Sequence, residues 1–524
     1  MDYDYIIGNG TLVDGNSTPK FKADVGILGD RIVAIGDLGT AQTKKRLDAT
    51  GLTLAPGFID VHNHSDGWLR KTPNFFPKTS QGFTTEVLMA DGISYAPVDR
   101  ATWRHWVYYM RALNGLQQND YNGWESIEEY MSGLNGATCQ NTITHIPYAH
   151  ARTMAMGWGR EAPDDVQMEE IQTSITHGME EGAVGISTGL DYISECFAQT
   201  DEIVEACKVI SEYGGLYVTH IRYKKGTLAG IKEAVEIGKR SNVSVHISHL
   251  KGTSQKQIDE ILTYIDTVAI NEVDFSFDVY PYLPGSTMLN YMLPYEVWEE
   301  GPLNVLAKLN DPIIRRRFSR IIERYEVNLE HIYIAWLPGK ENARYIGRSL
   351  GDFVNESCKT PADALSDLLI DENLAVLLVF HHGDDKLVHP FLSHPSYMMG
   401  TDGIYFPNGA VHPRMYGSAG RLLGPCVRDY KLFSLEEAVH KLSGLPAQRF
   451  GIEERGLISQ DYYADIVVFD ADTVKDQATY QDPHQFCLGI NHVFVNGTII
   501  VNDGQEVELQ GDVYPGKVLR YNQK

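Results

Sequence analysis

The stretch Pro56-Gly57-Phe58-Ile59-Asp60-Val61-His62-Asn63-His64-Ser65-Asp66 ends a short apolar run in two histidines spaced two residues apart. Alternate side chains of a β-strand point to the same face, so we expect both imidazoles on one face at the end of this strand. That spacing suits two ligands of one metal ion. The Gly/Pro punctuation before the run and the nearby acids Asp60 and Asp66 favour a metal site over two solvated loop histidines.

Length and composition indicate a large folded protein with two domains. The 524 residues exceed the usual size of one domain, although a (β/α)8 barrel can take up more than half of them. Hydrophobic residues make up 43% and charged residues 22%, which is ordinary for a globular chain. The net charge of -24 argues against nucleic acid or an anionic membrane surface as a partner, so we expect a small-molecule substrate.

The cysteines and the apolar segments predict a cytoplasmic protein. The six cysteines are scattered without Cys-x-x-Cys spacing, which is typical of reduced thiols. The N-terminus lacks the basic region and the long apolar run of a signal peptide. No apolar run approaches the roughly 18 residues of a membrane span. The composition leaves open whether the chain forms a homo-oligomer.

Short β-rich runs separated by turns occupy both ends of the chain. Residues 4–50 contain such runs around Asn9-Gly10 and Gly29-Asp30, which are typical hairpin turns. Residues 464–470 and 492–501 show a similar pattern of short β-rich runs. We therefore predict that residues 1–55 and 455–524 together build one small β-sandwich, with a central domain inserted between them.

Residues 56–454 alternate strand-like and helix-like segments, which predicts an α/β fold with a TIM-like (β/α)8 barrel. Helical patterns run, for example, from Asp201 to Tyr213 and from Leu228 to Arg240. Residues 288 to about 340 interrupt the alternation, with a helix after the capping Asp311, and we expect a lid there. Nine candidate strands compete for eight places, so one is misassigned or peripheral: 58–62, 83–88, 142–146, 183–187, 216–220, 243–249, 274–279, 375–380 and 397–401.

Three further polar residues lie where barrel strands should end: His220, His249 and Asp402. In the run 243–249, residue 249 shares a face with 245 and 247, so His249 and not His246 is the expected ligand. Each residue alone is more typical of a structural role. Four histidines and one aspartate on the catalytic face of one barrel, however, suit one or two zinc ions, and two ions can share a bridging hydroxide.

The order of these residues, with a sandwich split between the termini, resembles the amidohydrolase superfamily. Several strings are similar to its N-acyl-D-amino-acid deacylase (D-aminoacylase) branch, over essentially the whole chain. Besides residues 56–66 they are Gln81-Gly82-Phe83-Thr84-Thr85, Gly185-Ile186-Ser187-Thr188-Gly189-Leu190, Ser248-His249-Leu250-Lys251, Asp278-Val279-Tyr280-Pro281-Tyr282, Gly400-Thr401-Asp402-Gly403 and His412-Pro413-Arg414-Met415-Tyr416-Gly417.

The resemblance implies amide hydrolysis by a metal-bound hydroxide, with Asp402 as the catalytic acid and base. His62, His64 and Asp402 would frame one metal position, and His220 and His249 the other.

The resemblance also places four residues near the substrate: Lys251, Tyr282, Ser286 and Arg414. A cation such as Arg414 could hold a carboxylate through two hydrogen bonds. Without the motifs around them, Lys251 and Arg414 are equally compatible with salt-bridged surface residues.

The chain departs from that branch at its metal-binding cysteine, which is replaced by Asp91. A carboxylate there could bridge two ions, and as a hard ligand it would accept Mn2+ or another divalent ion as well as Zn2+. The alternative is that Asp91 only caps the turn at Gly92.

Other differences from the branch predict that the metal site is retained, while the residues of the substrate pocket differ from those of the branch. Tyr223 and Lys224 replace an acidic pair that the resemblance implies after His220. His381 and His382 follow a late strand where the branch has no histidines, and they are further candidates for substrate binding.

The predicted activity is metal-dependent hydrolysis of a non-peptide C–N bond, in an N-acyl-D-amino acid or a related carboxylated amide. One alternative is hydrolysis of a cyclic amide such as a hydantoin or lactam, or of another aromatic carboxylated substrate. A second alternative is a non-catalytic scaffold on the same fold. The retained ligands argue against the scaffold.

Overall fold

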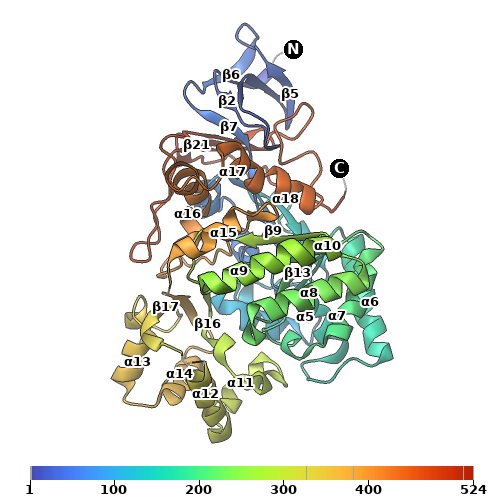
Figure 1. Cartoon of the computed structure of the whole chain (residues 1–524), viewed down its shortest axis with the longest axis vertical. Coiled ribbons are helices and arrows are strands. Elements are labelled where there is room, and N and C mark those ends of the chain that lie inside the picture. Colours follow the sequence, from blue (N-terminus) through green and yellow to red (C-terminus); the bar gives the residue numbers. More distant parts are fainter. Residues whose placement is uncertain (1–2, 326, 382, 512, 523–524) are drawn as a thin grey trace.

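The structure is a computed structural model, and it describes residues 3–325, 327–381, 383–511 and 513–522. It contains a β-sandwich, a barrel and an inserted unit. Figure 1 shows the sandwich at one end of the molecule, the barrel in the middle, and the inserted unit with α11–α14 projecting from the far side of the barrel.

Two sheets form the sandwich, and both ends of the chain contribute to it. One has the strand order β5-β4-β1-β6 and the other β23-β22-β21-β20-β7-β2-β3. The two ends join where β7 pairs with β20 in antiparallel register. The strands are β1 (Tyr3–Gly8), β2 (Thr11–Leu12), β3 (Phe21–Lys22), β4 (Asp24–Leu28), β5 (Arg31–Gly36), β6 (Thr43–Asp48), β7 (Thr53–Pro56), β20 (Ile466–Phe469), β21 (Ile490–Val495), β22 (Thr498–Asn502) and β23 (Gln505–Glu506).

One of the two predicted hairpins forms and the other does not. The turn at Gly29-Asp30 joins the antiparallel pair β4 and β5, as predicted. Asn9-Gly10, in contrast, carries the chain from β1 in one sheet to β2 in the other. The apolar core between the sheets explains the crossing, because Ile7 on β1 and Leu12 on β2 are both buried in that core.

Eight parallel strands form the barrel, which confirms the predicted fold class. The third strand is interrupted, since β10 pairs with β9 while β11 pairs with β12. The barrel closes where Val61 N donates to Met399 O (3.3 Å) and Asp402 N donates to His62 O (2.7 Å). The strands are β8 (Phe58–Asp60), β9 (Phe83–Leu88), β10 (Asn141–Thr144), β11 (Ile146–Pro147), β12 (Gly185–Gly189), β13 (Leu216–His220), β14 (Ser244–Ile247), β15 (Phe275–Val279) and β19 (Tyr397–Met399).

The surplus candidate among the nine predicted strands is 375–380, which does not belong to the barrel. It forms β18 (Leu377–Phe380), which pairs in antiparallel register with β16 (Ser286–Met288) and β17 (Ile332–Trp336). β15 pairs directly with β19, so no place in the barrel is left between them. An apolar run alone does not distinguish a barrel strand from a strand of a small antiparallel sheet.

The inserted unit is therefore longer than the predicted 288–340, because its sheet is completed only by β18. Its helices are α11 (Val305–Lys308), α12 (Pro312–Arg324), α13 (Leu350–Ser357) and α14 (Pro361–Asp371). α12 begins as predicted, since the side chain of Asp311 accepts a hydrogen bond from Ile313 N.

The remaining helices belong to the barrel and its flanks. α7 and α8 lie where helical periodicity was predicted. Among the described helices, none is both long and apolar enough to span a lipid bilayer. The helices are α1 (Asp66–Leu69), α2 (Phe76–Thr79), α3 (Trp103–Tyr109), α4 (Ile127–Ser132), α5 (Tyr148–Met156), α6 (Asp165–Glu180), α7 (Thr200–Ser211), α8 (Thr227–Ser241), α9 (Gln255–Tyr264), α10 (Ile270–Glu272), α15 (His389–Leu392), α16 (Arg414–Arg421), α17 (Leu435–Leu442) and α18 (Gly444–Arg449).

Candidate metal centre and active site

Four histidines converge at the carboxyl ends of three barrel strands. His62 and His64 follow β8, His220 ends β13, and His249 follows β14. The ring centroids of His62 and His249 are 4.8 Å apart, and those of His220 and His249 are also 4.8 Å apart. All four side chains are buried. The structure thus brings together residues that are up to 187 positions apart in the sequence, because parallel strands all end at the same face of a barrel.

Asp91 lies between the two pairs of histidines. Its Oδ1 is 3.6 Å from His62 Nε2 and 3.5 Å from His249 Nε2. Its Oδ2 is 3.8 Å from His64 Nε2 and 3.9 Å from His220 Nδ1. Each carboxylate oxygen therefore faces one nitrogen from each pair, which is the geometry expected of a bridging ligand.

The backbone after β9 directs this carboxylate inward. Asp91 has φ +58° and Gly92 has φ +70°, both in the left-handed region. Burial alone would raise the pKa of Asp91, but the imidazoles of His62 and His249 hold that pKa well below its usual range. The side chain is therefore an anion in the centre of the cluster.

Asp402 reaches the cluster from the loop after β19. Its Oδ1 is 3.3 Å from His64 Nε2, and its Oδ2 is 2.8 Å from Arg414 Nη1. Burial alone would raise the pKa of Asp402, but Arg414 and the nearby imidazoles hold it well below its usual range. Asp402 thus borders the His62–His64 position as a carboxylate.

The donor set fits divalent metal ions. Asp91 forms one group of ligand atoms with His62 and His64 and a second with His220 and His249, and within each group the atoms lie within 4.8 Å of one another. His62 Nε2 and Asp91 Oδ1 are buried without a hydrogen-bond partner. Buried polar atoms without partners are costly, and metal coordination would satisfy those that face the centre. Imidazole nitrogens and carboxylate oxygens are ligands that zinc prefers.

Asp278, for which the sequence predicts no role, contacts the residues of the centre. Its Oδ2 is 3.6 Å from His62 Nδ1 and 3.0 Å from His246 Nε2, while its Oδ1 accepts a hydrogen bond from His249 N (2.9 Å). His246 therefore points away from the ligand cluster, in agreement with the alternation along its strand. Its position near the carboxyl end of the predicted strand 274–279 was the signal that could have indicated a role at the metal centre.

The two acids that flank the histidine pair are structural and do not join the ligand cluster. Asp60 accepts hydrogen bonds from Thr401 N (2.8 Å) and Thr401 Oγ1 (2.7 Å) and pairs with the buried Lys78. This arrangement joins the ends of the first and last barrel strands, where His62 and Asp402 lie. Asp66 accepts from Met89 N (2.9 Å) and so fixes the loop that carries Asp91.

A cavity of about 380 Å³ opens over the metal cluster, and both the barrel and the inserted unit line it. Lys251 lines this cavity, and no carboxylate of the described residues lies within ion-pair distance of its ammonium. Ser286 also lines it, although its hydroxyl donates to Leu378 O (2.7 Å). Apolar and aromatic residues provide much of the remaining wall: Leu113, Tyr192, Tyr223, Leu283, Tyr291 and Phe380.

Two of the predicted substrate-binding residues do not line this cavity. Tyr282 turns away, since its hydroxyl donates to Asp476 Oδ2 (3.1 Å) and its ring packs against Arg421. Arg414 is fully buried beneath the cavity, where it pairs with Asp402. Its guanidinium pairs with a protein carboxylate in this structure, and its contact with a substrate stays a prediction.

His381, which follows β18, lies apart from the metal cluster. His381 stacks on Tyr333 and lies beside Tyr480, with ring centroids 4.2 Å and 4.5 Å away. It is absent from the cavity lining, although Phe380 at the end of β18 is part of it. His382 lies outside the described residues.

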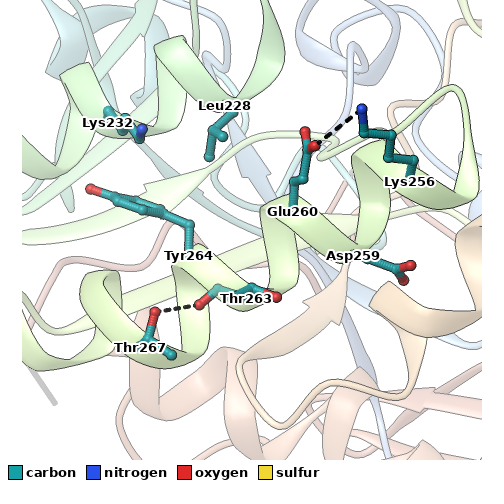
Figure 2. Close-up of a pocket in the computed structure, with 8 residues that line it drawn as sticks. All are labelled: Leu228, Lys232, Lys256, Asp259, Glu260, Thr263, Tyr264 and Thr267. Atoms are coloured by element: carbon teal, nitrogen blue, oxygen red, sulfur yellow. Dashed lines mark hydrogen bonds and ion pairs between the residues drawn. The ribbon is translucent and has the colours of Figure 1, made fainter.

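A separate hollow on the outside of the barrel has a different character. Figure 2 shows it between α8 and α9, with Lys256 and Glu260 forming an ion pair at 3.9 Å and Lys232 near the ring of Tyr264. No histidine lines this hollow. This hollow therefore lacks the imidazole ligands that line the cavity at the barrel mouth.

A (β/α)8 barrel with paired histidines, a carboxylate between the pairs and a further aspartate after its last strand defines a metal-dependent amidohydrolase, an enzyme that acts on C–N bonds. Comparisons with known proteins agree. The amidohydrolase family matches residues 390–501. D-aminoacylase of Alcaligenes xylosoxydans xylosoxydans is 34% identical over 99% of this chain and 97% of its own length.

Two further comparisons identify the branch. N-acyl-D-aspartate deacylase of the same organism is 31% identical over 98% of this chain and 95% of its own length. The crystal structure of N-acyl-D-glutamate deacylase from Bordetella bronchiseptica, with zinc and a phosphonate inhibitor, superposes with a TM-score of 0.85 at 31% identity, covering 99% of this chain and 100% of that one. The chain belongs to the amidohydrolase family, in its D-aminoacylase/N-acyl-D-amino-acid deacylase branch.

Proposed function

We propose that this enzyme removes the acyl group from an N-acyl-D-amino acid, with zinc at the metal centre. The observation that carries the proposal is the position of Lys251, a cation without a protein carboxylate partner among the described residues, in the same cavity as the histidine and aspartate cluster. Such a cavity suits a substrate that has an amide to be cleaved and a carboxylate to be held. The names of the similar proteins support the D-configuration and the N-acyl group.

The proposed mechanism assigns each group one task. The four histidines and Asp91 would hold the metal, which when bound lowers the pKa of water and polarises the scissile carbonyl. Asp402 would take a proton from the attacking water and deliver it to the leaving nitrogen. Arg414 keeps Asp402 oriented through the 2.8 Å ion pair. Lys251 would hold the carboxylate and so orient the amide toward Asp402.

The wall of the cavity favours a neutral, apolar or aromatic amino-acid side chain. Among the described residues that line it, Lys251 is the only lysine or arginine. A substrate with a second carboxylate would bury that charge against Leu113, Leu283 and the aromatic residues without a cation to pair with. Burying an unpaired charge is costly.

A substrate panel tests this assignment on the zinc-loaded and manganese-loaded enzyme. N-acetyl-D-leucine and N-acetyl-D-phenylalanine are expected to be cleaved with a kcat/KM at least about 10-fold above that of N-acetyl-D-aspartate and N-acetyl-D-glutamate, a difference of about 1.4 kcal/mol in binding the transition state. The L-enantiomers, hydantoins and lactams serve as comparison substrates. If no N-acyl amino acid is cleaved, the deacylase proposal is wrong, and cleavage of a hydantoin would replace it with a cyclic amide hydrolase.

Lys251→Met is expected to raise KM by about 10-fold to 100-fold for an N-acyl-D-amino acid, because a charge-assisted hydrogen bond contributes about 1.5 to 3 kcal/mol. Lys256→Met is the matched control, since this lysine lies on the outer surface of α9 (Figure 2). Steady-state kinetics of both variants provide the measurement. A Lys251→Met enzyme with the wild-type KM would show that another group holds the carboxylate.

A further inference from the structure

One carboxylate, Asp191, joins three segments of the chain beside the metal centre. It follows β12, and only 4% of its surface is exposed. Its Oδ1 accepts a hydrogen bond from Tyr295 Oη (2.8 Å). Its Oδ2 accepts from Lys224 N (3.1 Å) and from Tyr291 Oη (3.2 Å). Lys224 follows the metal ligand His220, whereas both tyrosines belong to the start of the inserted unit, so Asp191 connects the barrel to the insertion.

The same carboxylate also faces a metal ligand. Asp191 Oδ2 is 3.7 Å from His220 Nε2. The other ring nitrogen, His220 Nδ1, points to the centre, 3.1 Å from His249 Nε2 and 3.9 Å from Asp91 Oδ2. Asp191 therefore lies against the nitrogen that would not bind metal. A carboxylate in that place favours the tautomer with the proton on Nε2 and leaves Nδ1 free to coordinate.

Lys224 fixes the two tyrosines from the other side. Its ammonium lies over the ring of Tyr291 at 4.2 Å and over the ring of Tyr295 at 4.5 Å. It also donates to Tyr291 O (2.8 Å). Cation–π contacts and a charge-assisted hydrogen bond therefore hold the segment 289–298 where its hydroxyl groups meet Asp191.

Tyr291 connects this cluster to the substrate cavity. It lines the cavity, and its ring lies 5.4 Å from that of Tyr192, which in turn lies 4.7 Å from the ring of His220. A shift of the segment 289–298 would therefore move a wall of the cavity, and through Asp191 it would also disturb His220.

We propose that Asp191 is a positioning residue that couples the inserted unit to the metal centre: it orients His220 for coordination, and together with Tyr295 it anchors the segment that carries Tyr291, which lines the cavity. This coupling rests on the metal centre and does not depend on which amide is cleaved. Because coupling between two sites is reciprocal, metal binding at His220 should also stabilise the segment 289–298.

Asp191→Asn tests whether Asp191 orients His220 for metal binding, with zinc as the only added ligand. The variant is expected to bind one of its zinc ions about 10-fold to 100-fold more weakly, measured by metal analysis and by the rate of zinc transfer to a chelator, because a lost carboxylate partner of a ligating histidine has effects of this size. Asp259→Asn, which removes an exposed carboxylate on the outer helix α9, is the matched control, and its zinc affinity should stay near the wild-type value. An Asp191→Asn protein that folds and keeps wild-type zinc release would overturn the proposal.

Hydrogen exchange of the wild-type protein tests whether metal binding stabilises the segment 289–298. This test does not depend on the folding of any variant. Amides of residues 289–298 are expected to exchange more slowly in the zinc-loaded protein than in the metal-free protein, and this difference should shrink in Tyr291→Phe/Tyr295→Phe. The outer helix α9 provides the internal control, with no change on zinc loading. Equal exchange of residues 289–298 with and without zinc would contradict the coupling.

Discussion

Asp91→Ala is expected to lose at least one of the tightly bound metal ions of the wild-type protein, and with it nearly all hydrolytic activity. The reason is that both carboxylate oxygens of Asp91 face imidazole nitrogens of both histidine pairs, at 3.5 to 3.9 Å. Without this anion, the four imidazoles and Asp402 would have to hold the metal charge, and no carboxylate would lie between the two histidine pairs. Metal analysis after extensive dialysis provides the measurement.

Asp91→Asn separates the role of a ligand from that of a turn residue. Asparagine tolerates the left-handed backbone at this position, where φ is +58°, so it keeps the turn and removes the charge. Asp259→Asn on the exposed surface of α9 is the control for loss of a distant carboxylate. If Asp91→Asn keeps every ion of the wild-type protein, Asp91 only shapes the turn at Gly92 and the bridging role is wrong.

The identity of this ligand also has a consequence for metal selectivity. The resemblance implies a thiolate at the corresponding position, and a thiolate is a soft ligand that favours zinc. A carboxylate is a hard ligand that also suits manganese. We therefore expect the manganese-loaded enzyme to retain substantial activity in the same substrate panel.

Asp402→Asn is expected to lower kcat by about 100-fold or more while the fold is retained. Asp402 borders the His62–His64 position through its 3.3 Å approach to His64, and an amide cannot accept the proton of the attacking water. Asparagine again suits the backbone, since Asp402 has φ +48°. Single-turnover kinetics and the melting temperature are the two measurements.

The ion pair between Arg414 and Asp402 affects how the Asp402→Asn result is interpreted, and a double variant at both positions provides the control. Asp402→Asn leaves the buried guanidinium of Arg414 without its carboxylate partner, which by itself destabilises a protein. The double variant Asp402→Asn/Arg414→Met removes both charges and should recover stability without recovering turnover. A single variant with near-normal kcat would exclude Asp402 as the proton acceptor. Recovery of activity in the double variant would show that the single variant had failed only because of its unpaired arginine.

Local patterns in the sequence were sufficient for the barrel strands and for the residues placed at their ends. The two-residue spacing of His62 and His64, and the positions of His220 and His249 at the ends of apolar runs, predicted a common face because strand alternation is a local property of the backbone. Parallel strands then bring these ends together whatever the length of the connections. The match of Asp91 to a metal-binding position required only an ungapped comparison of neighbouring strings.

Contacts that depend on long-range packing could not be predicted in the same way. The run 375–380 is as apolar as a barrel strand, and only its pairing with β16 and β17 assigns it to the insertion. Arg414 is a cation in either case, so the sequence does not tell whether its guanidinium faces the cavity or pairs with Asp402. The structure shows that the guanidinium is buried and paired with Asp402. Asp191 gave no local signal, because its four partners come from segments up to 104 residues away. Side-chain identity thus determined which metal ligands, acids and cations the protein has. The tertiary structure decided which of these groups lie in contact with one another.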